Sequence, residues 1–514
     1  MHEIATAING YVWSPALIYL CLGAGLFFSI LTRFVQLRMF REMIHLLFSS
    51  KESDKGISSF QALAVSLSGR VGTGNIAGVA AAIGFGGPGA VFWMWVVAFL
   101  GASTAYVEAA MGQIYKEVDE GQYRGGPAFY IEKAMGQKWY AMLFAIATIF
   151  ACGMLLPTVQ ANAISTSAEI VLGTNGTVNL LMLGESSMTK VVGATLVVTI
   201  FGFIIFGGVK RIAHVTQVVV PFMALGYILT ALVIIIMNIG ELPRILGMIF
   251  ADAFTPMAGV GAAIGWGVKR GVYSNEAGQG TGVHAAAAAE VQHPAQQGLV
   301  QAFSVYVDTL FVCSATAFMI LITGIYNVGP ADAHAHVAGA QFIMQNIPVT
   351  IDAATNLPAM IDPESSAFTQ LAVDSVLPGV GKPFVAIALF FFAFTTVLAY
   401  YYIAETNIAY LRRFFRVPGE MVILKIVMMG AVFFGAVKTA SLAWTLGDIG
   451  VGLMAWLNII AILILFFMGK PALKALADYE RQKKAGVTEY TFDPEALGIE
   501  NADFWADKHT SSKQ

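Results

Sequence analysis

The stretch Ser68-Gly69-Arg70-Val71-Gly72-Thr73-Gly74-Asn75-Ile76-Ala77-Gly78 lies between two apolar runs, FQALAVSL before it and VAAAIGF after it. Glycine weakens a helix interior and adopts backbone conformations that other residues resist. A helix that loses its hydrogen bonds inside a bilayer exposes free N–H and C=O groups, which are tolerated only beside a cavity or a ligand. We therefore expect a membrane helix that is broken here, and we expect the break to be a binding site.

The composition is that of a protein embedded in a lipid bilayer. Hydrophobic residues make up 57% of the 514 residues, charged residues make up 12%, and the mean hydropathy is +0.70. This charged fraction is about half of that in soluble proteins. The net charge of −3 and the lack of a basic block give no reason to expect a nucleic acid partner.

Apolar segments of about 20 residues, long enough to cross a bilayer, recur along the chain. They predict an all-α polytopic membrane protein with 11 transmembrane helices. A preliminary helix near 11–31 precedes ten core spans, near 58–84, 88–112, 138–170, 190–209, 214–238, 250–290, 296–325, 382–412, 420–438 and 444–468. We expect three regions, at 1–57, 58–469 (the core) and 470–514 (a cytoplasmic tail). Within the core, two repeats occupy 58–238 and 250–468, and the polar stretch 326–381 is either an outer lid or an ordered surface loop.

The distribution of Lys and Arg predicts the orientation of the chain in a bacterial inner (plasma) membrane. Basic residues gather in alternate connections, at 33–55, 116–133, 210–211 and 412–416, and in the tail, whereas 326–381 has none. Cytoplasmic loops carry the excess of Lys and Arg. We therefore expect the N-terminus outside and the C-terminus in the cytoplasm.

A second glycine-rich stretch lies in the sixth core helix. Glycines at 259, 261, 265 and 267 flank Ala262-Ala263-Ile264, and the polar run SNEAGQGTG follows at 274–282. We favour a break at 261–267, and a break at 275–282 is the competing placement. Interrupted helices at corresponding positions of two halves indicate an inverted-repeat secondary transporter. We therefore expect a five-plus-five inverted repeat in which the first and sixth core helices are broken.

Broken helices present partial charges of both signs to a ligand. The N-terminal end of a half-helix offers N–H groups to an anion, and the C-terminal end of the other half offers carbonyls to a cation. An amino-acid zwitterion matches this arrangement, with its carboxylate at the amides near Thr73, Gly74 and Asn75 and its ammonium group at the second break. The alternative is that the glycines only allow helices to pack closely.

Three runs of sequence resemble the alanine or glycine:cation symporter family, the sodium:alanine symporters: GRVGTGNIAGVAAAIGFGGPGAVFWMW, YRGGPAFYIEKAMG and WGVKRGVYSNEAGQGTG. The likeness covers nearly the whole membrane part. It implies the leucine-transporter structural class, a small amino acid such as alanine or glycine as substrate, and sodium as the coupling ion. It also implies substrate contacts in the two broken helices, at Thr73, Gly74, Asn75, Ile264, Gly265, Trp266 and Gly267.

Polar residues inside two other spans are further candidates. Thr395 and Thr396 interrupt the apolar eighth core helix, and by the same resemblance they form a sodium site with the backbone near Ser68 and Val71. Alternatively, the two hydroxyls bond back to the preceding turn of their own helix. In the third core helix, the amide of Gln160 contacts either the substrate or another helix.

Ionisable residues inside the spans are also functional candidates: Arg70, Glu108, Lys269, Arg270, Glu276, Asp308 and Glu405. We expect most of them to pair, with Arg70 joined to Asp308 or Glu108 as a gate or as a structural ion pair.

The sequence therefore predicts a sodium-coupled symporter that imports alanine or glycine and needs no cofactor besides the sodium ion. A proton-coupled carrier of the same fold is one alternative. An ion channel is another, although selectivity filters are usually repeated around a symmetric pore. HExxH and GxSxG motifs do not occur, so we do not expect an enzyme.

Overall fold

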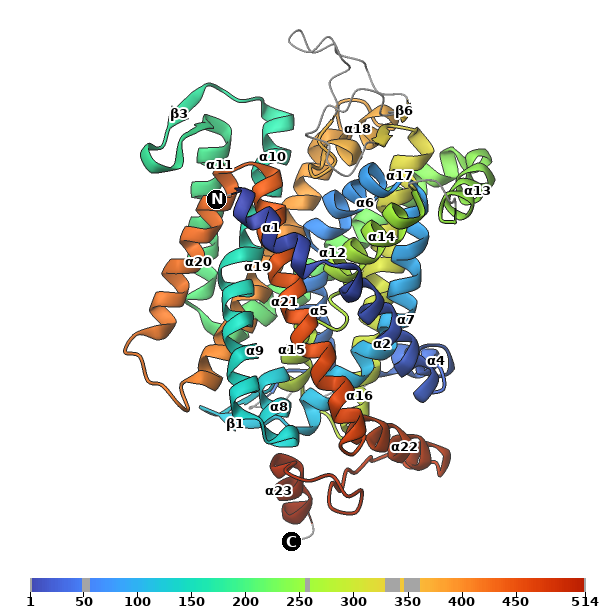
Figure 1. Cartoon of the computed structure of the whole chain (residues 1–514), viewed down its shortest axis with the longest axis vertical. Coiled ribbons are helices and arrows are strands. Elements are labelled where there is room, and N and C mark those ends of the chain that lie inside the picture. Colours follow the sequence, from blue (N-terminus) through green and yellow to red (C-terminus); the bar gives the residue numbers. More distant parts are fainter. Residues whose placement is uncertain (1, 49–55, 255–258, 329–342, 346–360, 513–514) are drawn as a thin grey trace.

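The computed structural model describes residues 2–48, 56–254, 259–328, 343–345 and 361–512, and nearly all of its regular structure is helical (Figure 1). Short antiparallel strand pairs occur in three connections of the described chain. The pairs are β1 (Glu117–Asp119) with β2 (Gln122–Arg124), β3 (Thr177–Asn179) with β4 (Glu185–Ser187), and β5 (Tyr326–Val328) with β6 (Ile343–Gln345).

Eight helical segments of the described chain are long and apolar enough to cross a bilayer. Five of them are single helices: α7 (Gly89–Ile114), α11 (Met188–Ile205), α19 (Gly381–Leu411), α20 (Glu420–Val437) and α21 (Ala440–Phe467). A sixth is formed by α12 (Gly208–Met237). The other two contain a stretch of π-helix: α9 (Lys138–Phe150), η2 (Ala151–Leu155) and α10 (Leu156–Leu172), and then α16 (Pro294–Val305), η5 (Tyr306–Cys313) and α17 (Ser314–Thr323).

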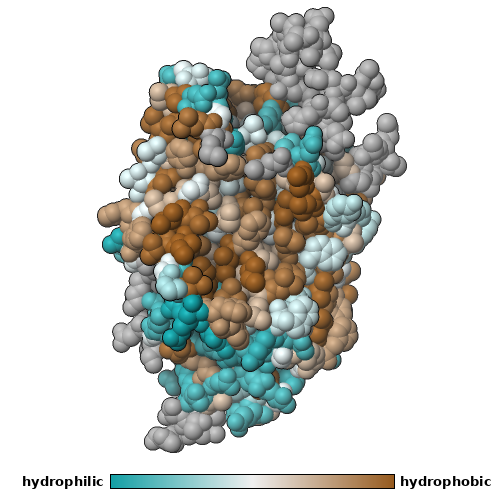
Figure 2. All heavy atoms as spheres, turned by 60° about the vertical axis from the view of Figure 1, so that its left-hand side comes forward, coloured by the Kyte–Doolittle hydropathy of each residue, from teal (hydrophilic) through white to brown (hydrophobic). Residues whose placement is uncertain are grey.

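A ninth span arises if α1 (His2–Val12) and α2 (Pro15–Leu31), which are bent by 42° at their junction, count as one. Proline ends one helix and begins the next readily, because it lacks an N–H group and its φ angle already suits a first helical turn. Figure 2 shows apolar residues across the middle of one face, with hydrophilic residues below them. The chain is therefore a polytopic membrane protein.

The first core helix is broken where the sequence predicts. It consists of α5 (Ser59–Arg70), η1 (Gly74–Gly78) and α6 (Val79–Gly86). The helix α5 starts with a capping box, in which the Gln61 amide donates to Ser58 Oγ (3.1 Å) and the Ser58 amide donates to Gln61 Oε1 (2.9 Å). Each piece is shorter than a full membrane span, so a count of continuous spans omits this helix.

The second break lies at the competing placement, and the favoured one is wrong. The helix α14 (Gly259–Asn275) continues through residues 261–267. The interruption comes between Asn275 and the start of α15 (Gly282–Ala288), where Glu276, Gly278 and Gly280 have φ angles of +56°, +88° and +79°. Only glycine takes such angles without strain.

Close packing explains the glycine at 267. A Cβ atom on Gly267 would lie 2.5 Å from the carbonyl oxygen of Ala90 and 2.6 Å from Cβ of Trp93, both in α7. This glycine lets two helix backbones approach, as small residues do between membrane helices. The glycine pattern at this point is therefore a packing signal.

The remaining helices lie at the ends of the bundle or in its connections. They are α3 (Val35–Arg38), α4 (Phe40–Leu47), α8 (Pro127–Met135), η3 (Leu181–Leu183), η4 (Ile239–Glu241), α13 (Leu242–Asp252), α18 (Ala367–Val376), α22 (Pro471–Lys484) and α23 (Asp503–Ser512). Figure 1 shows α22 and α23 at the end of the bundle that carries α8, and α18 at the opposite end. Much of the predicted outer segment 326–381 lies outside the described residues.

Candidate functional site

At the first break, side-chain oxygens accept hydrogen bonds from backbone amides that would bond to carbonyls in a continuous helix. The amide of Gly72 donates to Asn75 Oδ1 at 2.8 Å, and the amide of Thr73 donates to Gln160 Oε1 at 3.0 Å. Gln160 comes from α10, so the structure brings it to the break. The hydroxyl of Thr73 is buried and has no hydrogen-bond partner among the described residues. A buried hydroxyl without a partner is costly, which points to a ligand or water at this position.

The two neighbouring threonines of α19 differ in their hydrogen bonds. Thr396 donates from Oγ1 to the carbonyl oxygen of Ser68 at 2.7 Å, and also to that of Phe392 at 2.9 Å. Thr395 instead donates back to Phe391 and Phe392 of its own helix, at 2.9 and 3.1 Å. The Thr396 hydroxyl therefore meets the end of α5, whereas the Thr395 hydroxyl is bonded within α19.

The C-terminal end of α5 completes this corner of the site. Val71 is the C-cap residue, and its amide donates to the carbonyl of Leu67 at 2.7 Å. A Cβ atom on Gly72 would touch Oγ1 of Thr396 and lie 3.0 Å from Oε1 of Gln160. Carbonyl and hydroxyl oxygens gathered at a helix C-terminus are the ligands that a hard cation prefers.

The part of α14 that faces the first break is its C-terminal end. A Cβ atom on Gly74 would lie 3.1 Å from Cδ1 of Tyr273 and 3.3 Å from Cα of Ser274. Residues 264–267 are seven to ten positions earlier, roughly 10–15 Å along a helix axis. The basis for assigning Ile264, Gly265, Trp266 and Gly267 to the substrate site, a break at that point, is therefore removed.

Trp266 lies in a different environment. Its ring stacks on Phe85, near the end of α6, with ring centroids 4.5 Å apart. The charged ends of Lys269 and Arg270 each lie 5.1 Å from the same ring. Trp266 is thus part of a packed cap between α6 and α14.

A buried acceptor joins the two broken helices. Asp308 of η5 accepts from Asn75 Nδ2 at 2.6 Å, from the Ser274 hydroxyl at 2.9 Å and from the Thr309 hydroxyl at 2.6 Å. Asn75 belongs to η1 and Ser274 to α14, so one carboxylate contacts both helices that are broken.

A second carboxylate binds the backbone of the second break. Glu108 of α7 accepts from the amides of Gly278 at 3.3 Å and Gly280 at 3.2 Å, and from Asn458 Nδ2 at 2.8 Å. Two amides that the break leaves free are therefore held by a buried carboxyl group. Asn275 Nδ2, at the start of this break, is buried without a partner among the described residues.

Arg70 does not form the ion pair that the sequence suggested. Its guanidinium donates to the carbonyl of Gln301 at 3.1 Å and to the hydroxyl of Ser304. Within the described chain, its nitrogens make no ion pair within 4 Å with Glu108 or Asp308. Arg70 thus anchors the end of α5 to α16 through neutral oxygens.

The charged side chains of α14 meet two acidic residues toward the end of the bundle that carries α18. Asp448 of α21 accepts from Arg270 at 2.9 Å and from Lys269 at 2.6 Å. Glu364, which is outside the membrane-spanning helices, lies 3.5 Å from Arg270, and its carbonyl accepts from the indole of Trp444 at 2.8 Å. Burial raises the pKa of Glu364 to about 8. These contacts close the bundle above the two breaks.

Sequence reasoning did not select Ser274, Asp448 or Glu364. A signal for Ser274 was present in the polar run at 274–282, and a signal for Asp448 was its charge inside an apolar span. Glu364 carried no such signal, because the pairing depends on how the outer segment folds back over α14.

Comparison with known proteins gives one family and close relatives. The family model described as "Sodium:alanine symporter family" matches residues 1–494. YrbD of Bacillus subtilis (strain 168), whose name proposes a sodium/proton-dependent alanine carrier, is 56% identical over 100% of this chain and 99% of its own length. A sodium/proton-dependent alanine carrier protein of Bacillus sp. (strain PS3) is 47% identical over 90% of this chain and 97% of its own length. GlnT of Bacillus subtilis (strain 168), named as a probable sodium/glutamine symporter, is 38% identical over 95% of this chain and 92% of its own length.

Proposed function

The chain belongs to the sodium:alanine symporter family, and on that premise we propose that it imports alanine, glycine or a similarly small neutral amino acid together with sodium. The relatives reported above are named as sodium-dependent or sodium/proton-dependent amino-acid carriers. The observation that carries the proposal is the pair of broken helices, which meet beside their breaks, where Gly74 of η1 faces Ser274 near the C-terminal end of α14. Irregular backbone in a membrane protein is tolerated where it lines a binding site.

The substrate binds between the two breaks in this proposal. Thr73, Gly74 and Asn75 offer the N-terminal end of a half-helix to the substrate carboxylate, and Gln160 positions this segment. The unpartnered Thr73 hydroxyl and Asn275 amide supply further polar contacts. On the α14 side, we propose Tyr273 and Ser274 in place of residues 264–267. Little room beside Gly74 would favour a small side chain over a branched one.

Sodium binds at the corner between α5 and α19 in this proposal. The carbonyls of Ser68 and Val71 and the hydroxyl of Thr396 are its ligands. One sodium ion moving down a tenfold gradient at 100 mV releases about 3.7 kcal/mol, enough for about 500-fold accumulation of a neutral zwitterion. A single ion therefore suffices.

The membrane arrangement follows from the same proposal. Nine spans, counting the bent first pair as one, together with the two broken helices give 11 crossings, which divide into one preliminary helix and two sets of five. A break in the first helix of each set is typical of inverted-repeat transporters. The basic residues near α4, α8 and α22 support a cytoplasmic location for that end of the bundle, with the end that carries α18 outside.

Uptake by reconstituted vesicles tests the function. Labelled alanine, glycine and glutamine are offered under an inward sodium gradient, an inward proton gradient or neither. We expect sodium to drive uphill accumulation of alanine or glycine, with glutamine taken up poorly. Accumulation with protons alone would favour a proton-coupled carrier, and a current without uphill accumulation would favour a channel.

A further inference from the structure

Three buried carboxylates share one buried arginine at the centre of the bundle. Arg70, Glu108, Glu276 and Asp308 each have at most 2% of their surface exposed, and Arg70 interacts electrostatically with all three acids. One positive charge balances only one of the three negative charges. Because an unbalanced charge is costly to bury, at least one of these acids must gain a proton or a cation.

Hydrogen bonding distinguishes the three acids. Glu108 accepts three hydrogen bonds, two of them from backbone amides, and Asp308 accepts three from side chains. Glu276 accepts one, from the hydroxyl of Thr281 at 2.8 Å onto Oε2. Its Oε1 atom is buried and has no partner among the described residues. Hydrogen bonds stabilise the ionised form of a carboxylate, so Glu276 is the acid whose charge is least supported by hydrogen bonds.

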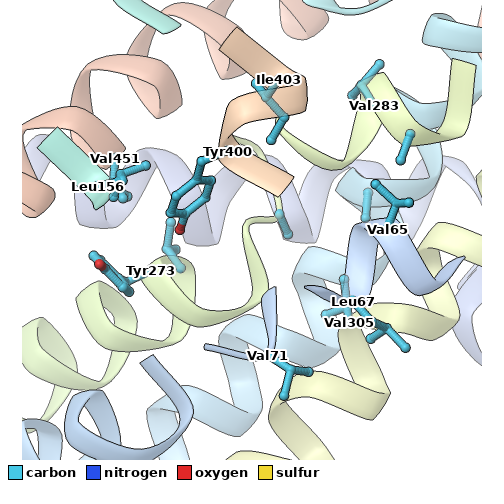
Figure 3. Packing of buried hydrophobic residues seen from close by; sticks show 14 of the residues in the cluster. Val65, Leu67, Val71, Leu156, Tyr273, Val283, Val305, Tyr400, Ile403 and Val451 are labelled. Atoms are coloured by element: carbon cyan, nitrogen blue, oxygen red, sulfur yellow. The ribbon is translucent and has the colours of Figure 1, made fainter. Parts of the chain in front are cut away.

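Glu276 lines a small cavity between α5, α15 and α19. Polar and small groups among its lining residues are Ser66, Gly69, Glu276, Thr281 and Tyr402. A Cβ atom on Gly69 would lie 3.4 Å from Oε1 of Glu276. The cavity offers about 10 Å³, close to the smallest space that holds one water molecule. Figure 3 shows one apolar side chain from each of these three elements, Val65, Val283 and Ile403, in the same part of the core.

Other titratable groups surround Glu276 on the elements packed against it. They are Arg70 on α5, Glu108 on α7, Asp308 on η5, Tyr273 on α14, Cys152 on η2, and Tyr400 and Tyr402 on α19. Arg70 is the only cation in this group, and it is already hydrogen-bonded to two oxygens of α16.

We propose that Glu276 is a proton-binding site separate from the sodium site, and that its protonation is coupled to the transport cycle. A hydronium ion gives a proton to Oε1: one O–H bond of hydronium breaks, one forms on the carboxylate, and a neutral acid and a water molecule result. The cavity provides space for the water that delivers it. Glu276 occupies the first position of the second break, with φ at +56°, so its charge changes beside the backbone that separates α14 from α15. This inference rests on the proposed function.

The test compares the pH dependence of sodium-driven alanine uptake in three proteins, measured in vesicles with a fixed sodium gradient from about pH 5.5 to 8.5. We expect wild type to change severalfold across this range, since one titrating acid goes from about nine-tenths to about one-tenth protonated over two pH units. Glu276→Gln, which resembles the protonated acid, should transport with a change of less than about twofold. Glu241→Gln, which removes an exposed carboxylate paired with Arg244, should keep the wild-type profile.

The outcomes separate this inference from the proposed function. If Glu276→Gln shows the same pH profile as wild type, the proton site is overturned and sodium coupling is unaffected. If the wild-type protein shows no sodium-driven uptake, the proposed function itself is overturned. If Glu276→Gln does not fold, proton exchange by the wild-type protein tests the proposal. Purified protein in weak buffer with a pH-indicating dye should take up or release a fraction of a proton per molecule when sodium and alanine are added. No proton exchange at any pH in this range would overturn the proposal.

Discussion

The hydroxyl of Thr396 donates a 2.7 Å hydrogen bond to the main-chain carbonyl of Ser68, which joins α19 to the last turn of α5 across 328 residues of sequence. That carbonyl belongs to the final turn before the break, where helical carbonyls lack their usual partners. The neighbouring Thr395 makes no such contact, because its hydroxyl bonds within α19. The pair therefore provides a test residue and a matched control one position apart.

Thr396→Ala should raise the sodium concentration for half-maximal alanine uptake by about tenfold, which corresponds to about 1.4 kcal/mol of lost ion binding. Thr396→Ser keeps the hydroxyl and should remain near wild type. Thr395→Ala should also leave the sodium dependence unchanged, since its hydroxyl bonds back to its own helix and to Sδ of Met223 and makes no bond to α5. Uptake against sodium concentration in vesicles measures all three. Equal effects of Thr395→Ala and Thr396→Ala would remove the ion site from this corner.

Gly72→Ala should abolish alanine uptake while the protein still folds. The added methyl group would collide with Oγ1 of Thr396 and lie 3.0 Å from Oε1 of Gln160, so it would push apart the groups that hold the break. Gly226→Ala is the matched control, because a Cβ atom there meets nothing within 4 Å. Uptake and elution of a single monodisperse species in detergent are the measurements. If Gly72→Ala transports at more than about half of the control rate, the site tolerates displacement of Thr396 and Gln160.

Trp266→Ala should destabilise the protein by about 3 kcal/mol without changing which amino acids it prefers. The reason is that its ring packs on Phe85 near the end of α6, and the interruption of the helix lies at 276–281. The ratio of alanine uptake to glutamine uptake tests the preference, and the thermal unfolding midpoint tests the packing. A shift of that ratio toward glutamine would return Trp266 to the wall of the substrate site.

Stability should fall as the pH rises from about 5 toward 8, in part through Glu364. Burial raises the pKa of this carboxyl from 4.5 to about 8, so the folded protein holds a proton that the unfolded chain releases. The unfolded chain therefore binds fewer protons in this window, and the free energy of unfolding decreases with pH by up to about 1.4 kcal/mol per unit. Above about pH 8, Glu364 is ionised in both states, so its contribution to the pH dependence of stability levels off.

The side chain introduced by Glu364→Gln is neutral at every pH. The stability of this variant should therefore decrease less steeply with pH than that of wild type. The measurement is the thermal unfolding midpoint of the purified protein in detergent between pH 5 and 8. Glu241→Gln serves as the control with an exposed carboxylate. The same slope in Glu364→Gln as in wild type would mean that Glu364 does not hold the proton.

Composition and glycine placement predicted a helical polytopic membrane protein and the position of its first break, whereas contacts between distant helices were not predictable. The first break was predictable because three glycines fall within seven residues, at Gly72, Gly74 and Gly78, beside polar Thr73 and Asn75. The second was misplaced because glycines serve two purposes. Those that line a break and those that let helices touch look alike in sequence, and the contact of Gly267 with α7 becomes visible only when both helices are placed.

For the candidate site too, the sequence indicated individual residues and did not indicate their partners. Gln160 and Thr396 were predicted as isolated polar residues in apolar helices, and both reach the first break. The partners of Arg70 and Asp448 were not predictable, since a charge inside a span shows that it needs a partner without showing which one. Backbone and hydroxyl oxygens of α16 serve Arg70, and two cations of α14 serve Asp448.

Equilibrium binding of labelled alanine to the purified protein, measured while the sodium concentration is varied, tests the central claim most directly. The claim is that the two breaks form one site in which sodium at Ser68 and Thr396 supports the helix end that holds the amino acid. We predict that alanine affinity rises at least about tenfold between sodium-free and saturating sodium, and that Thr396→Ala shifts this rise to higher sodium while Thr395→Ala does not. Alanine affinity that is independent of sodium in wild type would contradict the account.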